Sequence, residues 1–218
     1  MSIISALPSE SGPSARLLFR LLLAVDIQGY SARSPRMQLQ AQQDLLEAME
    51  VAATEVELDR GQWLQQVSGD GELAVLPADA DIVTVIGTFA PTLERVLAEM
   101  NRRDARDPRL RVRLAFHHGA LIMGRPASLG PAGDAPVVVS RLLDARPLRQ
   151  YLTSHPERRV ALIVSEQVYR EVVCSGFCSL PPSNFRFVRT TIKGMMYQGY
   201  IYDPDRKNGA GEGEIVTR

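Results

Sequence analysis

The sequence predicts an α+β fold in which helices flank a central, mainly antiparallel β-sheet. Segments with strand and helix periodicity follow one another in the order strand, helix, hairpin, helix, strand, which is the order of a ferredoxin-like sandwich. The 218 residues have 45% hydrophobic content and no internal repeat or linker, so they can build one core of ordinary size. We therefore expect one domain over residues 15–203, between a disordered tail at 1–14 and a flexible tail at 204–218.

The first half of the chain contains two clear structural signals. Ser34 followed by Pro35 is typical of a helix start, and apolar residues at helical spacing extend this helix to about Leu58. The segment Ser68-Gly69-Asp70-Gly71 between two short apolar runs is typical of a hairpin turn. Around these signals we expect strands at 16–27, 63–67 and 72–76 and a second helix at 81–102.

The second half continues the alternation of strands and helices. Arg111 and Arg113 alternate with apolar residues over 110–116, which predicts a strand. Lys193-Gly194 between two β-rich runs predicts a closing hairpin. The other expected elements are a turn at Gly119, a strand at 120–123, a loop at 125–136, a helix at 137–152, a strand at 160–164, a helix at 165–173 and hairpin strands at 185–192 and 196–202.

Composition excludes several classes of protein. The 25 basic and 25 acidic residues balance, so charge provides no reason to expect nucleic acid or an anionic membrane as a partner. The apolar run at 17–25 is short and contains Arg20, so it cannot span a bilayer. Two cysteines are too few for a disulfide scaffold or a complete zinc site, and the N-terminus lacks the features of a signal peptide. We expect a cytoplasmic protein.

Asp26 is the first candidate site residue. It follows the apolar run of the first strand, where its carboxylate can bind a metal ion and the carbonyl of Ile27 can add a second oxygen ligand. The turn that follows presents the N–H groups of Gly29, Tyr30 and Ser31, and successive N–H groups that point one way suit a triphosphate. The alternative is that Asp26 only caps this turn.

Asp70 is the second candidate, and its plain alternative is the Asp-Gly pair of a tight hairpin turn. One helix and one strand separate it from Asp26, which allows adjacent strands to present both carboxylates at one rim of the sheet. Two carboxylates at one rim are what a pair of magnesium ions needs while it also holds phosphate. The pair is therefore more specific than either aspartate alone.

Five segments in order resemble the class III nucleotidyl cyclase homology domain, the adenylate/guanylate cyclase family, over roughly residues 16–203. The first two contain Asp26 and Asp70 and resemble the two metal motifs of that family. The other three are Arg113-Leu114-Ala115-Phe116-His117-His118-Gly119, the stretch from Gly133-Asp134 to Ser140-Arg141-Leu142, and Ile192-Lys193-Gly194. The resemblance implies a nucleotidyl cyclase version of the ferredoxin-like fold.

The resemblance also implies a mechanism. Such domains pair head to tail, and one protomer supplies both metal aspartates, here Asp26 and Asp70, for two magnesium or manganese ions. The other protomer supplies the transition-state arginine, here Arg141. The ribose 3′-hydroxyl of a nucleoside triphosphate attacks the α-phosphate, pyrophosphate leaves, and a 3′,5′-cyclic nucleotide forms. Lys193 can reach the triphosphate as a point charge, or it is a surface lysine in a hairpin turn.

Three positions depart from the family pattern. The purine-reading lysine is replaced by Gln66, its partner aspartate by Gly130, and the ribose-orienting asparagine by Val137. An amide such as that of Gln66 can both donate and accept hydrogen bonds, so it can read guanine, uracil or cytosine. Family relatives that make pyrimidine cyclic nucleotides in anti-phage signalling also lack the purine pair, which makes cUMP or cCMP synthesis, and a role in antiviral defence, an open hypothesis.

Three functions remain open from the sequence. The first is an active homodimeric cyclase with altered base preference, indicated by retention of Asp26, Asp70 and Arg141. The second is a catalytically inactive cyclase-like module that dimerises or binds nucleotide as a regulator, indicated by the three changed positions. The third is a ferredoxin-like scaffold with no nucleotide role. The base, the regulatory input and the downstream effector are not determined by the sequence.

Overall fold

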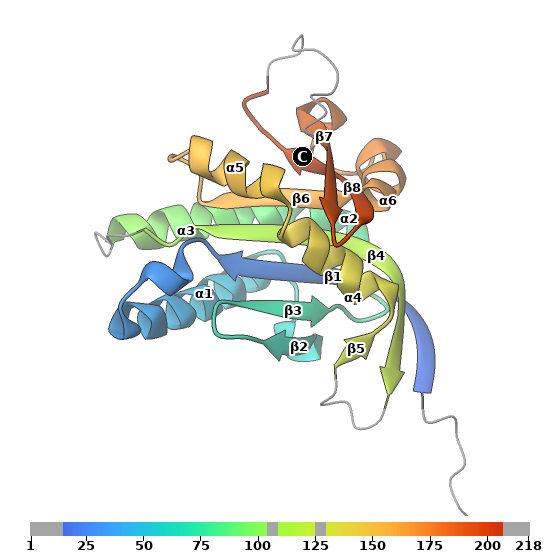
Figure 1. The fold of residues 1–218 in the computed structure, drawn as a ribbon, viewed down its shortest axis with the longest axis horizontal. Helices are drawn as coiled ribbons and strands as arrows, with labels where there is room; N and C mark the ends of the chain where they lie inside the picture. Colours follow the sequence, from blue (N-terminus) through green and yellow to red (C-terminus); the bar gives the residue numbers. More distant parts are fainter. Residues whose placement is uncertain (1–14, 104–108, 125–129, 207–218) are drawn as a thin grey trace, which may run out of the picture.

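The structure is a computed structural model, described here for residues 15–103, 109–124 and 130–206 (Figure 1). One sheet has the strand order β2-β3-β1-β4-β6-β8-β7, and β5 pairs with β4 at one end. Among the described strands only the β4–β6 pairing is parallel, so the prediction of an α+β fold with a mainly antiparallel sheet is confirmed. The strands are β1 (Ala15–Ile27), β2 (Leu64–Val67), β3 (Gly71–Val75), β4 (Val112–Gly124), β5 (Pro131–Ala132), β6 (Val160–Ser165), β7 (Phe185–Ile192) and β8 (Met195–Tyr202).

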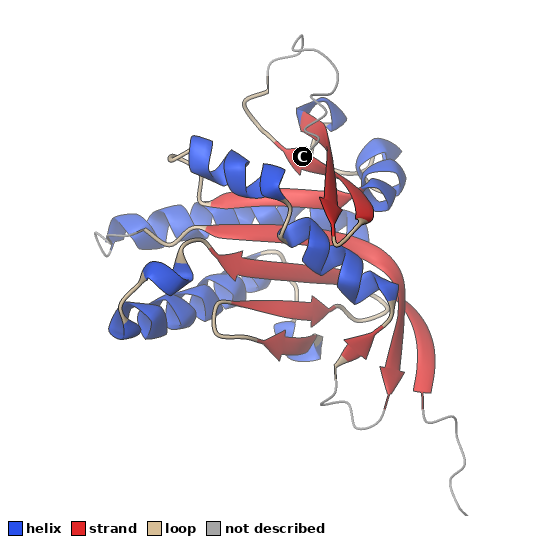
Figure 2. Cartoon of the chain, in the orientation of Figure 1, coloured by secondary structure: helices blue, strands red, loops and turns tan. Residues whose placement is uncertain are grey.

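Helices cover both faces of this sheet (Figure 2). The α4 and α5 helices lie in front of it in Figure 1, and α1 and α3 pack in the separate core on the other face. Within the described residues, no helix has the length and apolar character needed to cross a membrane. The helices are α1 (Pro35–Glu55), α2 (Ile82–Thr84), α3 (Ala90–Arg103), α4 (Asp134–Leu143), α5 (Arg146–Ser154) and α6 (Glu166–Glu171), with short η turns at Tyr30–Ala32, Arg60–Gln62, Val173–Ser175 and Pro182–Asn184 and a π-helical turn, η3, at Val85–Phe89.

The central strand β1 separates the two cores. Leu21, Leu23 and Val25 point into the core with α1 and α3, whereas Leu22 and Ala24 point into the core with α4 and α5. This alternation follows from the two-residue period of a strand. A strand that is buried on both faces needs apolar residues at every position, which explains the continuous apolar run of β1. By the same alternation, Asp26 lies on the face covered by α4.

The predicted turn at Gly119 is wrong. β4 continues through this residue to Gly124 and pairs with β1, with Gly119 opposite Arg20. A Cβ atom at Gly119 would lie 3.1 Å from the Cβ of Ala135 and 2.6 Å from Nε2 of His117. The glycine therefore lets α4 and a histidine ring approach the strand closely, and it does not break the strand.

The predicted helix at 81–102 is interrupted. The π-helical turn η3 separates α2 from α3, and Pro91 lies in the first turn of α3. Because proline has no N–H, a regular helix would leave the carbonyl of Gly87 without its donor. The hydroxyl of Ser179 donates to that carbonyl at 2.7 Å, so a residue from a distant loop stabilises the irregular turn.

The predicted helix at 137–152 is two helices. α4 ends at Leu143 and α5 begins at Arg146, with Pro147 in its first turn. The preceding loop, predicted at 125–136, contains the short strand β5 and the start of α4 at Asp134, and residues 125–129 lie outside the described residues. The helix predicted at 165–173 is also shorter, because α6 ends at Glu171.

The predicted hairpin at Lys193-Gly194 is confirmed. β7 and β8 pair from Phe185 opposite Tyr202 to Ile192 opposite Met195. Lys193 and Gly194 have φ angles of 52° and 78°, the left-handed conformation that a two-residue turn between right-twisted strands requires. The start of the expected C-terminal tail contacts the domain, since the Asn184 amide donates to the carbonyl of Pro204 at 3.1 Å.

Candidate active site

Asp26 lies at the end of β1, beside the turn that contains Asp70. In the sheet Asp26 is opposite Gly71 of β3 on one side and opposite Arg113 of β4 on the other. A Cβ atom at position 71 would lie 2.0 Å from the carbonyl oxygen of Val25. Only glycine permits this approach, and the approach brings the two aspartate-bearing segments together.

Asp26 forms a bidentate ion pair with Arg113. Nε of Arg113 lies 2.8 Å from Oδ1 of Asp26, and Nη2 contacts Oδ2. Nη1 of Arg113 also donates to the carbonyl of Leu143 at 3.2 Å. Both paired side chains are only about one-seventh exposed, at 13% and 14%. Arg113 therefore connects the first candidate metal ligand to the C-terminal end of α4.

The environment of Asp26 makes its carboxyl group unusually easy to protonate. Burial raises the pKa of Asp26 from 3.8 to about 6. The charge and hydrogen bonds of Arg113 lower that pKa, and the negative charges of Asp144 and Asp70 raise it. Near neutral pH the carboxylate is thus ionised with little margin, and an added cation beside it would be favoured.

The backbone of Ile27 faces the turn that contains Asp70. Its N–H donates to the carbonyl of Asp70 at 2.8 Å. Since the N–H and C=O of one strand residue point the same way, the Ile27 carbonyl is directed to this turn as well. Asp70 itself is exposed, and its Oδ1 accepts a hydrogen bond from the hydroxyl of Ser68 at 3.4 Å. The three predicted metal ligands lie at one end of the sheet.

The turn after β1 is held against the Asp70 turn by a residue that the sequence reasoning missed. Gly29 has a φ of 67° and precedes the short η1 turn, Tyr30–Ala32. The first hydrogen bond of this turn is donated by the N–H of Ala32 to the carbonyl of Gly29, so the turn itself does not use the N–H groups of Tyr30 and Ser31. The Gln42 amide on α1 donates to the hydroxyl of Tyr30 and, at 2.7 Å, to the carbonyl of Gly69. Glutamines on an exposed helix face are common, so nothing in the sequence distinguishes Gln42.

Gln66 and Gly130 are in contact. Gln66 is exposed on β2, and a Cβ atom built at Gly130 would lie 2.9 Å from Oε1 of Gln66. Gly130 also has a φ of 76°, a conformation that favours glycine. The two positions that the family resemblance assigns to a purine-binding pair are therefore neighbours, and the side chain at position 66 covers the space that a side chain at 130 would need.

Val137 and Arg141 are one helical turn apart on α4, so they share one face of that helix. Val137 is 46% exposed and Arg141 is half-buried. Within the described residues Arg141 has no hydrogen-bond or ion-pair partner. No hydrogen bond or ion pair of the described residues joins Arg141 to Asp26 or Asp70, and the charges that most affect the Asp26 carboxyl are those of Arg113, Asp144 and Asp70.

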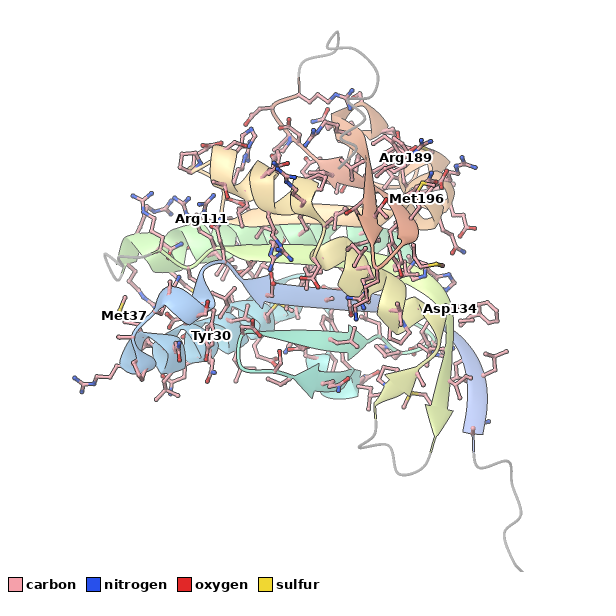
Figure 3. All side chains as sticks on the ribbon, in the orientation of Figure 1. Tyr30, Met37, Arg111, Asp134, Arg189 and Met196 are labelled. Atoms are coloured by element: carbon pink, nitrogen blue, oxygen red, sulfur yellow. The ribbon has the colours of Figure 1, made fainter. Side chains whose placement is uncertain are left out.

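Lys193 is exposed at the β7–β8 turn, at the end of the sheet away from Asp26. β8 runs antiparallel to β6, and β6 runs parallel to β4. The start of β8, next to the hairpin turn, and the start of β4, which contains Arg113, are therefore at different ends of the sheet. Figure 3 shows Tyr30 and Arg111 at one end of the molecule and Asp134 and Met196 at the other. Within one chain, the structure does not bring Lys193 to the two aspartates.

The donors fit a divalent ion that is bound together with a nucleotide. In the parts of the chain that the structure describes, no group of three or more His, Cys, Asp and Glu side chains could hold a metal alone. Two carboxylates and a carbonyl are nevertheless a set that magnesium uses when substrate phosphates and water complete its coordination. Arg113 is the group with which such an ion must share Asp26, or which it must displace.

Comparison with solved structures identifies the fold. The guanylyl cyclase Cya2 aligns with a TM-score of 0.61 at 13% identity, covering 87% of this chain and 93% of that one. The adenylate/guanylate cyclase/hydrolase from Silicibacter pomeroyi has a TM-score of 0.61 at 20% identity, covering 88% and 99%. The adenylyl cyclase CyaB from P. aeruginosa has a TM-score of 0.61 at 14% identity, covering 89% and 98%.

These similarities show that the chain has the fold of the class III nucleotidyl cyclase domain, as its motifs predict. No protein-family model matches the sequence, and no curated protein sequence matches it either. The low sequence identities to the solved structures are consistent with the absence of a sequence match, because a sheet and its two cores tolerate extensive substitution when size and apolar pattern are kept.

Proposed function

We propose that this protein is a homodimeric nucleotidyl cyclase that converts a nucleoside triphosphate to a 3′,5′-cyclic nucleotide and pyrophosphate. One observation carries the proposal: in the fold of nucleotidyl cyclases, Asp26, Asp70 and the Ile27 carbonyl are collected at one end of the sheet by the glycine contact at Gly71. This geometry supports use of two magnesium or manganese ions.

In the proposed reaction the two ions, when bound, lower the pKa of the ribose 3′-hydroxyl and hold the triphosphate. The residues of this chain position those groups. Asp26 and Asp70 supply carboxylate oxygens, and the N–H groups of the turn Gly29-Tyr30-Ser31 can donate to phosphate oxygens. Arg141 of a second copy would neutralise the charge that develops on the α-phosphoryl group as pyrophosphate leaves.

The proposal that Arg141 acts in the active site of a second copy is supported by its lack of contacts within one chain. It is a half-buried arginine with no partner among the described residues, on a helix face that it shares with the exposed Val137. Lys193 also needs a second copy if it is to approach the triphosphate, because its hairpin lies at the other end of the sheet. A head-to-tail homodimer accommodates both requirements.

The contact between Gln66 and Gly130 supports a base pocket that is altered but well packed. The two changes fit each other sterically, since the amide of Gln66 lies where a Cβ atom at position 130 would be. A primary amide is complementary to the N3 edge of uracil or cytosine and to the edge of guanine. We therefore include pyrimidine triphosphates, with cUMP or cCMP as products, among the substrates to be tested. A role in antiviral signalling would follow only from such a product.

The alternative is an inactive cyclase-like module that dimerises or binds nucleotide. The ion pair of Arg113 with Asp26 favours it, because a cation already occupies the first candidate metal ligand. Val137 favours it as well, because its side chain cannot hydrogen-bond to a ribose.

The direct test is a panel of the four ribonucleoside triphosphates with Mn²⁺ or Mg²⁺, with cyclic product identified by mass spectrometry. We expect one base to be preferred, and we expect Asp70→Asn and Arg141→Ala each to reduce the rate by about 10²–10³-fold. Mixing these two variants should partly restore activity, because a mixed dimer contains one site with both the aspartates and the arginine. Absence of product from all four substrates at high enzyme concentration would favour the inactive module.

A further inference from the structure

One side chain joins the two turns that contain candidate metal and phosphate ligands. Nε2 of Gln42, on α1, donates to the hydroxyl of Tyr30 at 2.5 Å and to the carbonyl of Gly69 at 2.7 Å. Tyr30 lies beside α1 in the turn after β1 (Figure 3), and Gly69 directly precedes Asp70. Gln42 is 12 residues from Tyr30 and 27 residues from Gly69 in the chain, so neither turn can form this contact by itself.

The amide of Gln42 uses both of its N–H hydrogens in this contact. The carbonyl of Gly69 can only accept a hydrogen bond, so the amide must present its nitrogen to Gly69. The second hydrogen is then donated to the hydroxyl oxygen of Tyr30. A Cβ atom built at Gly69 would lie 3.6 Å from Nε2 of Gln42 and 3.6 Å from that hydroxyl oxygen, so the turn at Gly69 packs directly on both groups.

The turn at residues 68–70 has few other contacts that fix its position. All of its residues are exposed. One backbone hydrogen bond joins the turn to β1, from the N–H of Ile27 to the carbonyl of Asp70 at 2.8 Å. Among the described residues, Gln42 provides the only side-chain hydrogen bond to this turn from outside the β2–β3 hairpin. The position of the Asp70 carboxylate relative to Asp26 therefore depends on these two hydrogen bonds.

Gln42 is a firm support for the turn because α1 is packed in the core. Ala41 and Leu45, on the same helix, are 3% and 7% exposed in the core that β1 shares with α1, and Gln42 itself is half-buried. An exposed turn opens at a lower cost in free energy than an element packed in the core. A hydrogen bond from the packed helix therefore restricts the motion of the turn that contains Asp70.

We propose that Gln42 is a positioning residue, which fixes the Asp70 turn against the turn after β1 and thereby increases the affinity of the site for a divalent cation. A cation that contacts both Asp26 and Asp70 must order a mobile turn when it binds, and that loss of conformational entropy weakens binding. Gln42 restricts the turn before the cation arrives. The effect on cation affinity rests on the proposed function, whereas the contact between the two turns does not.

Two neighbouring backbone amides distinguish motion of the turn from motion of β1. The amide hydrogen of Ile27 is donated to the carbonyl of Asp70, so its exchange with solvent reports opening of the turn. The amide hydrogen of Gln28 is donated to the carbonyl of Arg111 at 2.9 Å, so its exchange does not depend on the turn. Hydrogen exchange of the full chain, followed by NMR without added metal, measures both rates.

Gln42→Met retains a side chain of similar length and a good helix former, but it has no donor. We expect exchange at Ile27 to become about tenfold faster, the effect of losing one hydrogen bond, while exchange at Gln28 is unchanged. Gln43→Met, at an exposed position on the same helix, is the matched control and should change neither rate. Tyr30→Phe removes one of the two acceptors and should accelerate Ile27 less; it decides if Gln42→Met does not fold by circular dichroism. Unchanged exchange at Ile27 would overturn the inference.

The second measurement is the affinity for Mn²⁺, obtained from the electron paramagnetic resonance signal of the free ion. Gln42→Met should bind Mn²⁺ about tenfold more weakly than the parent and Gln43→Met, because the ion then has to order the turn. Asp70→Asn should weaken binding at least as much, because it removes a ligand. Equal Mn²⁺ affinities of the parent and Gln42→Met would overturn the inference alone, whereas absence of Mn²⁺ binding by the parent would overturn it together with the proposed function.

Discussion

Two arginine–carboxylate pairs, whose carboxylates are on the neighbouring strands β3 and β1, lie on opposite faces of the sheet and have different physical roles. Arg60 pairs with Glu72 at 2.9 Å on the face covered by α1 and α3, and Glu72 is opposite Val25 in the sheet. Arg113 pairs with Asp26, the next residue of β1, on the face of α4. The Arg60–Glu72 pair (the core pair) is enclosed by the core, whereas the Arg113–Asp26 pair (the rim pair) lies at the rim of the sheet.

The core pair is fully satisfied. Arg60 is 2% exposed, and its guanidinium also donates to Glu50 at 2.8 Å and lies 5.0 Å from the ring centre of Trp63. Each of its nitrogens has a partner, and both carboxylates are fixed by it. Such an arrangement has no capacity for another cation, and we interpret it as structural.

The rim pair differs because its carboxylate has competing neighbours. Burial, Asp144 and Asp70 raise the pKa of Asp26 against the effect of Arg113, to about 6. A carboxylate in that condition gains from any added positive charge. The difference teaches that pairing with arginine does not by itself make a carboxylate structural, since the number and sign of the other charges decide what it can still bind.

The largest expected effect is on the core pair. Arg60→Met should lower the free energy of unfolding by about 3–5 kcal/mol, because it leaves the buried Glu72 without a counter-charge. Urea denaturation at pH 7 measures this loss. The matched control is Arg95→Ala, which breaks the exposed pair with Glu55 and should leave the unfolding midpoint unchanged. Equal, small effects of the two changes would contradict the structural role of Arg60.

The second prediction concerns pH and Asp26. Its pKa is raised on folding from 3.8 to about 6, so the folded state holds this proton where the unfolded state releases it. Stability from this group is present below pH 4 and is lost as the pH rises to about 6, by roughly 3 kcal/mol in total. Asp26→Asn removes that dependence.

The unfolding free energies of the parent and of Asp26→Asn, measured between pH 4 and pH 7.5, provide the test. The stability of the parent relative to the variant should increase as the pH is lowered from 6 to 4, and the difference should stay constant above about pH 7. A pH-independent difference would show that Asp26 titrates in the same range in both states, and the comparison with the core pair would then lose its basis.

The smallest effect is expected from breaking the rim pair. Arg113→Met should lower the free energy of unfolding at pH 7 by about 1–3 kcal/mol, less than Arg60→Met, because Asp26 can take up a proton when its counter-charge is removed. The pKa of Asp26 should rise further above 6, which the same pH series detects. If Arg113→Met destabilises as strongly as Arg60→Met, the rim pair is as structural as the core pair.

Much of the fold was predictable because burial imposes a residue pattern. The continuous apolar run of β1 and the turn pairs Asp70-Gly71 and Lys193-Gly194 determine their local structures without help from distant residues. Two of the errors occurred where a distant contact overrides the local signal. Gly119 continues a strand because α4 packs on it, and Pro91 is accommodated because Ser179 supplies the missing donor.

The residues of the candidate site were predictable from the sequence, whereas the contacts between them were not. By itself the sequence predicted that Asp26 and Asp70 follow or join strands, that Gln66 and Gly130 stand where the family resemblance places a purine-reading pair, and that Arg141 lies on a helix. Only the tertiary structure decided that Arg113 pairs with Asp26 and that Gln66 lies against Gly130. The physical reason is that these contacts join segments far apart in the chain, and their partners are set by the order of strands and the packing of helices, on which local residue patterns carry no information.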